Sequence, residues 1–478
     1  MTLWSSIVRA SAVTALILAG VSLAPPASAR ATHCVRWIDP EGDDGWTGSS
    51  SKPWATIEHA ASVLPDEGCT VWIRPGIYSG SNQVTRAFTH RTTFRGVDPY
   101  QAVLGGVRAP LDIGAGASHI TFQGLRFREW ASGAGVLVYI SGRDDGFPAP
   151  SHILLRDNVI HDSYGDDLLK IRSGAHDIAV RGNVFYNQAD SEQHIDVNSV
   201  TDVTISDNIF FNDFESSGRV DRRLTKHYIV VKDSNGGADG LRGSRRVTIE
   251  RNVFLRWQGG EESFISIGND GKRYLEARNV DIVNNLMLGD GTDWIGSALR
   301  VLGAGQVTFV NNTISGDLPS TDYAFFVGSK GLNPPNQDVT LVNNIWSDPT
   351  GTMSEFSDGL PEDTRNLVFT RNLYWNGGNT IPAGDLLTPL HDDEKAVVAD
   401  PGLREANKAL ELPVWSGGAF RSGSRTIREE FIRLVRRFGA IPDGSRAIGR
   451  ALETFAPARD ILGRSRGADP DLGAYEGR

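Results

Sequence analysis

The sequence predicts a right-handed parallel β-helix, and two observations support this fold class. Short segments with alternating apolar residues recur along the chain, and each runs into an asparagine and a further apolar pair, as in His152–Ile160 and Asp177–Phe185. A two-residue apolar period is typical of strands, and its recurrence at one register is typical of a solenoid. The 478 residues also include 53 glycines and only 3 methionines, which suits an all-β chain rich in turns.

The recurring asparagine measures the length of the repeat. Its spacing runs from 25 to 44 residues. The shorter spacings fit one coil of a three-sided solenoid, and the longer ones add loops to a coil. Asparagine tolerates the left-handed conformation of a sharp bend, and its amide can bond to the copy in the next coil. We therefore expect one column of asparagines at successive bends, formed by Asn158, Asn183, Asn208, Asn252, Asn285, Asn312, Asn344 and Asn372.

Residues 1–29 have the pattern of a cleaved export signal. Arg9 precedes an apolar run from Ala10 to Leu23, and a small-residue cleavage pattern ends at Ala29. The apolar run is shorter than the roughly 20 residues that span a bilayer. We therefore expect a secreted, extracytoplasmic protein that keeps no integral membrane segment after cleavage.

The mature chain is expected to be one solenoid with a cap at each end. Residues 30–105 should hold the N-terminal cap and the first coils, with a helix within Trp54–Leu64. The parallel β-helix should occupy residues 106–400. Residues 401–478 lose the repeat and should form an irregular C-terminal cap with a helix over Thr426–Phe438. Caps of this kind cover the open edges of a solenoid, so we expect a monomer.

Cys34 and Cys69 are the only two cysteines of the chain. Export permits disulfides, and both residues lie close to the mature N-terminus. We expect one disulfide that fastens the first coil, and two buried thiols are the alternative.

Charged residues interrupt the repeat in three successive coils. In the first of these coils, apolar neighbours on both sides of Lys170 should point inward, so the strand period sends Lys170 and Arg172 outward. Asp166 and Asp167 precede them in the turn. An outer face with two cations and two nearby carboxylates differs from the small, weakly polar outer face of most other coils.

The next two coils repeat this departure. In the second coil the same period directs His194, Asp196 and Asn198 outward, and in the third coil it directs Lys232 outward, with His227 at the strand start.

The ladder asparagines align these coils with one another. Counting back from them places Lys170 beside Asp196 on the adjacent coil, about 4.8 Å away along the axis. Lys232 is expected to stack next. A solvated charge ladder that only supports coil stacking is the alternative interpretation.

Three short segments resemble the outer-face motifs of β-helix polysaccharide lyases of the pectate and alginate lyase type. They are Asp166–Ile171, His194–Val197 and Val230–Ser234, and the architectural resemblance covers Trp54–Trp375. In such lyases, acidic residues on the outer face bind Ca²⁺ and a lysine or arginine is the base. The chain has no run of three calcium-binding aspartates of the pectate lyase kind. It also lacks the paired lysine–serine and arginine–histidine pattern of alginate lyases.

Elimination chemistry matches these residue types on physical grounds as well. The proton beside a uronate carboxylate is very weakly acidic, so a cation must stabilise the enolate-like intermediate while a base removes the proton. A lysine can be that base if neighbouring cations and burial depress its pKa, and Lys170 beside Arg172 is the expected example. We predict catalytic roles for Lys170, Arg172 and Lys232, calcium ligands in Asp166, Asp167 and Asp196, and substrate contacts from His194, Asn198, His227 and Arg242.

Two other functions remain open at this stage. A glycoside hydrolase needs two carboxyl groups about 5 to 9.5 Å apart, and Asp166 or Asp167 with Asp196 could supply them. A non-catalytic glycan-binding β-helix is the third alternative. The net charge of −10 argues against nucleic acid as the partner, whereas a local basic cluster still permits an acidic polysaccharide.

Overall fold

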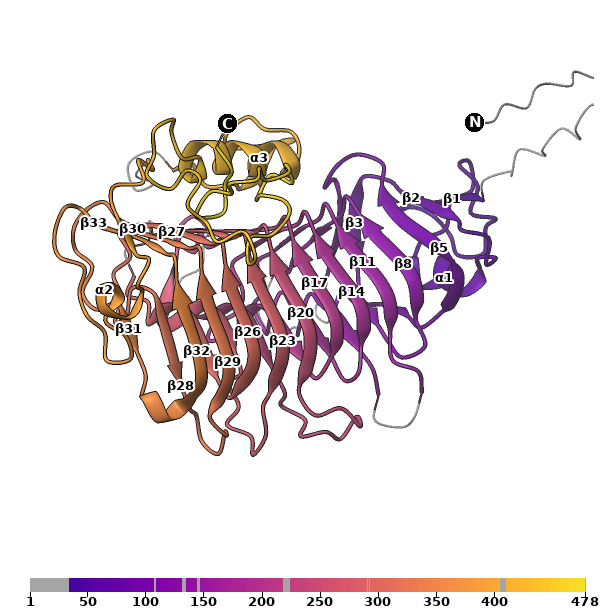
Figure 1. The fold of residues 1–478 in the computed structure, drawn as a ribbon. Coiled ribbons are helices and arrows are strands. Elements are labelled where there is room, and N and C mark those ends of the chain that lie inside the picture. The colour runs from indigo at the N-terminus through magenta and orange to yellow at the C-terminus, as the bar shows by residue number, and fades with distance from the viewer. Residues whose placement is uncertain are drawn as a thin grey trace, which may run out of the picture. The chain divides into compact units, whose positions relative to one another are not determined.

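Three long parallel sheets run side by side, and the chain passes through them in turn (Figure 1). The computed structural model describes residues 34–106, 109–130, 135–143, 147–217, 224–289, 291, 293–404 and 410–477. Residues 34–478 form one unit by their contacts. The expected signal, residues 1–29, lies outside the described residues. The predicted parallel β-helix is confirmed.

Each coil contributes one strand to each sheet, so neighbours within a sheet come from successive coils. Within the described ranges, the first sheet contains β1 (Val35–Ile38), β2 (Thr70–Ile73), β5 (Ala87–Gly96), β8 (Ser118–Gln123), β11 (Ser151–Arg156), β14 (His176–Arg181), β17 (Thr201–Ser206), β20 (Ser244–Glu250), β23 (Ala277–Val283), β26 (Ala304–Val310), β29 (Asn336–Val342) and β32 (Thr364–Thr370).

The second sheet contains β4 (Asn82–Val84), β7 (Leu111–Ile113), β10 (Val138–Ser141), β13 (Leu169–Arg172), β16 (Gln193–Asn198), β19 (Thr225–Lys232), β22 (Gly259–Ile267), β25 (Ser297–Leu302), β28 (Phe325–Gly328) and β31 (Ser357–Asp358). The third contains β3 (Gly76–Ser79), β6 (Ala102–Gly105), β9 (Arg126–Phe127), β12 (Val159–His161), β15 (Val184–Tyr186), β18 (Ile209–Phe211), β21 (Val253–Phe254), β24 (Leu286–Gly289), β27 (Thr313–Gly316), β30 (Ile345–Asp348), β33 (Leu373–Asn376) and β34 (Val397–Val398).

The asparagine column predicted from the sequence lies at the bend between the first and third sheets. Asn158 donates to Oδ1 of Asn183 from its backbone N–H, at 2.9 Å, and from its side-chain amide, at 3.1 Å. The same two hydrogen bonds join every following pair of ladder asparagines, down to Asn344 and Asn372. Asn372 in turn donates to the carboxylate of Asp393, which ends the column.

The left-handed backbone at this bend belongs to the residue before each ladder asparagine. Asp157, Gly182 and Asp207 have φ of 53°, 66° and 58°. The conformational tolerance of asparagine is therefore not what the column uses. The ladder positions are selected for hydrogen bonding in a fully buried site.

We expect Asn208→Leu to lower the free energy of unfolding by roughly 1 to 3 kcal/mol, because it leaves the donors of Asn183 and the carbonyl groups around them unpaired. Urea titration followed by circular dichroism measures this change. Thr204→Leu, on the outer face of β17 just before this bend, is the matched control and should stay within about 0.5 kcal/mol of the parent. An equal effect of both substitutions would contradict a structural role for the column.

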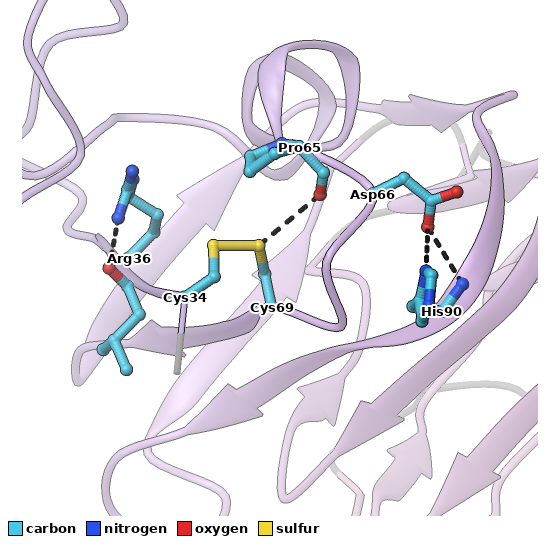
Figure 2. Close-up of a disulfide and its surroundings, with 7 residues drawn as sticks. Cys34, Arg36, Pro65, Asp66, Cys69 and His90 are labelled. Carbon is cyan, nitrogen blue, oxygen red and sulfur yellow. Dashed lines mark hydrogen bonds and ion pairs between the residues drawn. A yellow bond between two sulfur atoms is a disulfide. The ribbon is translucent and has the colours of Figure 1, made fainter. Parts of the chain in front are cut away.

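The N-terminal end carries a short helix and the disulfide. Helix α1 (Ile57–Val63) begins at Thr56, whose side chain accepts a hydrogen bond from the N–H of His59, and its apolar side packs into the solenoid core. Cys34 and Cys69 form the expected disulfide, with their Cα atoms 4.5 Å apart (Figure 2). Because each cysteine directly precedes a strand, the disulfide joins the starts of β1 and β2.

The C-terminal segment covers a flank of the solenoid, not its open end (Figure 1). It contains a small hairpin of β35 (Trp415–Ser416) and β36 (Ala419–Phe420), then α3 (Ile427–Leu434) and a π-helical turn, η2 (Val435–Gly439). The predicted helix is thus present. Its buried side chains pack against outward apolar residues of the third sheet, among them Val184, Phe211 and Leu286.

The open end is closed by the chain that follows the last full coil. Leu386, Leu387 and Ala396 pack against the solenoid core, and β34 pairs with β33. The short helix α2 (Pro389–Asp392) lies in this stretch, and the 3₁₀ turn η1 (Pro361–Asp363) precedes β32. These residues therefore cap the open end of the solenoid, a role that was expected of residues 401–478.

Candidate active site

The predicted pairing of Lys170 with Asp196 is present on the outer face of the second sheet. Strands β13 and β16 are in register with Lys170 opposite Asp196, and Nζ lies 3.3 Å from Asp196 Oδ2. The flanking residues Leu169 and Ile171 are fully buried in the core. The alternation of the strand therefore fixes the outward direction of both charges.

The Lys170 ammonium gathers three carboxylates. Besides Asp196, its Nζ lies 2.9 Å from Asp167 Oδ2 and 3.5 Å from Asp166 Oδ1. Asp167 is completely buried, and its other oxygen accepts the backbone N–H of Gln193 at 2.8 Å. Asp196 Oδ1 is buried and has no hydrogen-bond partner among the described protein atoms. Lys170 thus forms ion pairs with three clustered carboxylates, of which Asp167 and Asp196 are buried.

The expectation that Lys170 has a depressed pKa is wrong. Burial alone would lower the pKa of Lys170, but the charges of Asp167, Asp196 and Asp166 together outweigh burial and raise it above the ordinary value. Arg172, the cation expected to depress it, directs Nε to the hydroxyl of Ser173 at 3.1 Å. Lys170 is therefore a protonated cation at neutral pH.

Lys232 lies two residues further along its strand than the predicted position next to Asp196. Val230, and not Lys232, lies next to Asp196, while Lys232 pairs with Asn198 and Asn198 with Arg172. The long side chain nevertheless returns to the cluster, because its Nζ is 3.7 Å from Asp196 Oδ2. It also lies 3.8 Å from Oδ1 of Asp270. Burial alone would lower the pKa of Lys232, but the charges of the neighbouring carboxylates outweigh burial and raise the pKa above its ordinary value. This lysine is therefore protonated as well.

Asn198 is linked to Asp270 of the site through Ser234. Its side chain exchanges two hydrogen bonds of 2.8 Å with Ser234, and the Ser234 hydroxyl donates to Asp270 at 2.6 Å. Since Asn198 is almost completely buried, it is placed to position Asp270 instead of meeting a large ligand.

His194 does not point outward as predicted. Its ring lies in the core, stacked 4.4 Å from Tyr228 and 6.0 Å from Phe210, and Nε2 lies 3.1 Å from Asn212 Oδ1. Two consecutive residues turn inward where each of these strands begins, as Leu168 shows one coil earlier. Burial lowers the pKa of His194 to about 3, so the ring is neutral.

His227 and Arg242 have other surroundings. His227 is buried with Nδ1 3.0 Å from the Ser263 hydroxyl, and burial together with nearby cations holds its pKa well below the ordinary value. Arg242 is exposed on the loop after β19, where its guanidinium lies 5.9 Å from the ring centre of Tyr274. Tyr274 lies in the loop after β22, so Arg242 contacts that neighbouring loop.

Glu192 and Asp270 belong to the site and were missed from the sequence. Glu192, Asp166 and Asp167 each offer an oxygen within 4.8 Å of the other two. Burial first, and the surrounding carboxylates second, raise the pKa of both Glu192 and Asp167. Glu192 lies two residues before His194, so continuing the predicted outward series from Asn198 through Asp196 and His194 would have reached it.

Five carboxylates therefore surround two ammonium groups on this face: Asp166, Asp167, Glu192, Asp196 and Asp270 against Lys170 and Lys232. The excess negative charge favours bound protons or a bound cation. Carboxylate oxygens are the ligands that Ca²⁺ prefers. The predicted set changes in one member, because Glu192 joins Asp166 and Asp167 while Asp196 is held between the two lysines.

The same face continues toward later coils. Arg300 on β25 is in register with Ser266, and Ser266 with Val230, so Arg300 follows Asp196 in one outward column. Its guanidinium pairs with Glu262 and lies 5.2 Å from the ring centre of Phe326. A guanidinium can bind a carboxylate through two N–H donors, and the ring beside it offers an apolar surface.

Asp322, close to Arg300, is a further titrating group on this side. Burial first, then Asp358 and Glu355, raise the pKa of Asp322 to about 7. The folded state therefore binds a proton more tightly than the unfolded chain, and the free energy of unfolding should fall as pH rises from about 4 to about 7. Asp322→Asn should flatten this part of a thermal-unfolding pH series. Asp281→Asn, on the exposed face of β23, should leave it unchanged, and a persisting slope in Asp322→Asn would contradict the assignment.

Comparison with known proteins supports the fold. No family model matches the chain. The uncharacterized protein YwoF of Bacillus subtilis (strain 168) is 27% identical over 173 residues, which are 34% of this chain and 36% of YwoF, so the match spans about a third of that relative. Among solved structures, XylC in complex with xylose superposes with a TM-score of 0.53 and 11% identity, over 92% of this chain and 98% of XylC. Pectate lyase Pel9A superposes with a TM-score of 0.50 and 12% identity, over 94% of this chain and 97% of Pel9A. At these identities the likeness shows a common architecture, and the chain has the β-helix fold that polysaccharide lyases use.

Proposed function

We propose that this protein is a secreted polysaccharide lyase that cleaves a uronate-containing polysaccharide by β-elimination. The observation that carries the proposal is the cluster of five carboxylates around Lys170 and Lys232 on the outer face of a β-helix sheet. A charge ladder that only supported coil stacking would pair its charges one to one, whereas here five carboxylates surround two ammonium groups. The pKa values of Asp167 and Glu192 are raised, first by burial and second by the neighbouring carboxylates.

Calcium fits this cluster. Asp166, Asp167 and Glu192 are hard oxygen donors within reach of one another, and a cation there would relieve the repulsion between them. Bound Ca²⁺ would supply the positive charge that a substrate carboxylate needs, since the cluster without it would repel a uronate. The proposed ligands are these three residues.

The two lysines are proposed to remove the proton and to stabilise the charge of the intermediate. Lys170 is the proposed base, and as a protonated ammonium it must release its own proton to solvent before it can accept one from the substrate. A cation bound by Asp166 and Asp167 would favour that release, because it would offset the carboxylate charges that raise the pKa of Lys170. Lys232 stays beside Asp196 and Asp270 and is proposed to stabilise the negative charge of the intermediate. Arg172 lies in the same column as Lys232 and is proposed to bind a neighbouring carboxylate of the chain.

Export agrees with two further findings. The Cys34–Cys69 disulfide suits an oxidising compartment. Among the described residues, no helix combines the length and apolar character that a membrane crossing requires. We propose an extracytoplasmic enzyme that acts as a monomer on an acidic polysaccharide.

A glycoside hydrolase is the second candidate, and one observation favours it. Asp167 and Asp196 both lie within 3.3 Å of the same ammonium, and the pKa of Asp167 is raised as in a general acid. Against this, Asp167 is completely buried beneath Lys170.

The product distinguishes the two candidates. Incubation with a panel of pectate, alginate, glycosaminoglycan and neutral glycans should give an increase in ultraviolet absorbance from the C4–C5 double bond of an elimination product. Release of saturated reducing sugars without that absorbance would show the hydrolase instead. Binding without cleavage of any glycan would leave the face as a binding surface.

A further inference from the structure

A cavity of about 780 Å³ lies on another side of the molecule, at the bend between the first and third sheets. Its floor is formed by the ends of the first-sheet strands and the left-handed residues that follow them. Residues of the C-terminal segment form its other wall: Thr426, Ile427, Arg428, Arg459, Leu462 and Gly463. A cavity of this size is in the usual range for small-ligand sites.

Arginine dominates the lining of this cavity. Six arginines line it together with two aspartates: Arg95, Arg156, Arg181, Arg251, Arg428 and Arg459 with Asp157 and Asp207. Arg251 also pairs, at 2.7 Å, with Glu250, which lies outside the lining. This local excess of positive charge occurs in a chain with a net charge of −10. A concave basic site of this kind attracts anions even when the protein as a whole is acidic.

Asp207 is too small a partner for its neighbours. Guanidinium nitrogens of Arg181, Arg251 and Arg428 lie 3.2, 3.3 and 3.6 Å from its carboxylate. A guanidinium has five N–H donors, and a carboxylate can satisfy only a few of them. Arg181 and Arg428 are also 64% and 47% exposed, so donors remain available to a second anion.

The arginines are spaced by the strands that carry them. Arg95 is in register with Gln123, Gln123 with Arg156, and Arg156 with Arg181. Adjacent strands lie about 4.8 Å apart, so these side chains form a row along the stack of coils. Arg428 approaches this row from the first turn of α3, which also carries Glu429 and Glu430. A single small anion would not use such a row, whereas a chain with an acidic group on successive sugars would.

We propose that this cavity binds a segment of an anionic oligosaccharide, with its carboxylate or sulfate groups held by the guanidinium forks of the arginine row. Bidentate N–H donors in a plane match both groups. The site does not depend on the activity proposed for the second sheet, and it would tether the protein to an acidic glycan whether or not that glycan is cleaved.

The test is isothermal titration calorimetry with tetragalacturonate, with a sulfated tetrasaccharide and with inorganic sulfate, each on the parent and on Arg156→Gln/Arg181→Gln. We expect at least one of the two tetrasaccharides to bind, and the double substitution to weaken that binding by at least about tenfold. Binding should also weaken as salt increases. Which tetrasaccharide binds identifies carboxylate or sulfate as the recognised group.

Arg246→Gln is the matched control, since this exposed arginine also pairs with one aspartate but lies at the start of β20. It should leave the affinity unchanged. Lys170→Ala separates this site from the outer face of the second sheet. If Lys170→Ala abolishes binding while Arg156→Gln/Arg181→Gln does not, or if only inorganic sulfate binds, the cavity proposal is wrong and the proposed lyase site is untouched.

Discussion

Lys170→Ala is expected to lower kcat on the cleaved polysaccharide by at least about a hundredfold, with a smaller change in KM. Lys170 holds three carboxylates together and is the proposed base, so its loss removes the proton acceptor and the counter-charge of Asp167 and Asp196 at once. Initial rates followed by the ultraviolet absorbance of the product measure the effect.

Two further variants make this result specific. Lys226→Ala removes another lysine of the same face, which pairs with Glu262 at 3.2 Å, and it should retain near-parental kcat. Lys170→Arg keeps the positive charge but has no accessible neutral form at working pH, so it should be nearly as inactive as Lys170→Ala. An effect of Lys170→Ala confined to KM would make Lys170 a substrate contact. Substantial activity of Lys170→Arg would show that the charge, and not proton removal, is what the reaction needs. Circular dichroism should first establish that each variant is folded.

Removal of calcium is expected to abolish activity, and added calcium to restore it. The reason is the excess of carboxylates, which repels a polyuronate unless a cation intervenes. Glu192→Gln removes one of the three proposed ligands and should weaken the calcium affinity, taken from activity against free calcium, by at least about tenfold. Binding should also tighten with rising pH, because the ligands must lose their protons, and both Glu192 and Asp167 have raised pKa values.

Glu261→Gln is the control for calcium, because Glu261 is exposed on the same sheet and outside the three-residue cluster. It should leave the calcium requirement as in the parent. Full activity in chelator with saturated products would contradict both calcium and elimination, and would leave Asp167 and Asp196 as the pair of a hydrolase.

The sequence was sufficient for the fold because the fold repeats. Each ladder asparagine must bond to the next one, so a single chemical requirement recurs and becomes visible without any relative. The opposition of Lys170 and Asp196 followed from the same register. The strand period and the coil register therefore predict the positions of those residues that follow both.

The site departs from the prediction where the chain leaves the strand period. His194 lies in the core because two adjacent residues turn inward at the strand start. Lys232 is displaced by two residues because the loop after β19 breaks the count back from Asn252. Asp270 lies in the loop after β22, where no alternation exists. The raised pKa of Lys170 depends on which charges surround it in space, and Arg172, its neighbour in sequence, gave the opposite expectation.

The C-terminal segment changes how the molecule should come apart. In a solenoid each coil touches only the coils beside it, so opening at one end can spread coil by coil. Here the carbonyls of Arg459, Asp471 and Leu452 accept from Asn284, Asn311 and Asn343 on three successive coils. Tyr100, far earlier in the chain, meets Trp415 edge to face with the ring centres 4.6 Å apart. Distant coils are thereby coupled through one lateral strap. Fraying from either end must break this strap as well, which turns a gradual, zipper-like loss of structure into a more concerted transition.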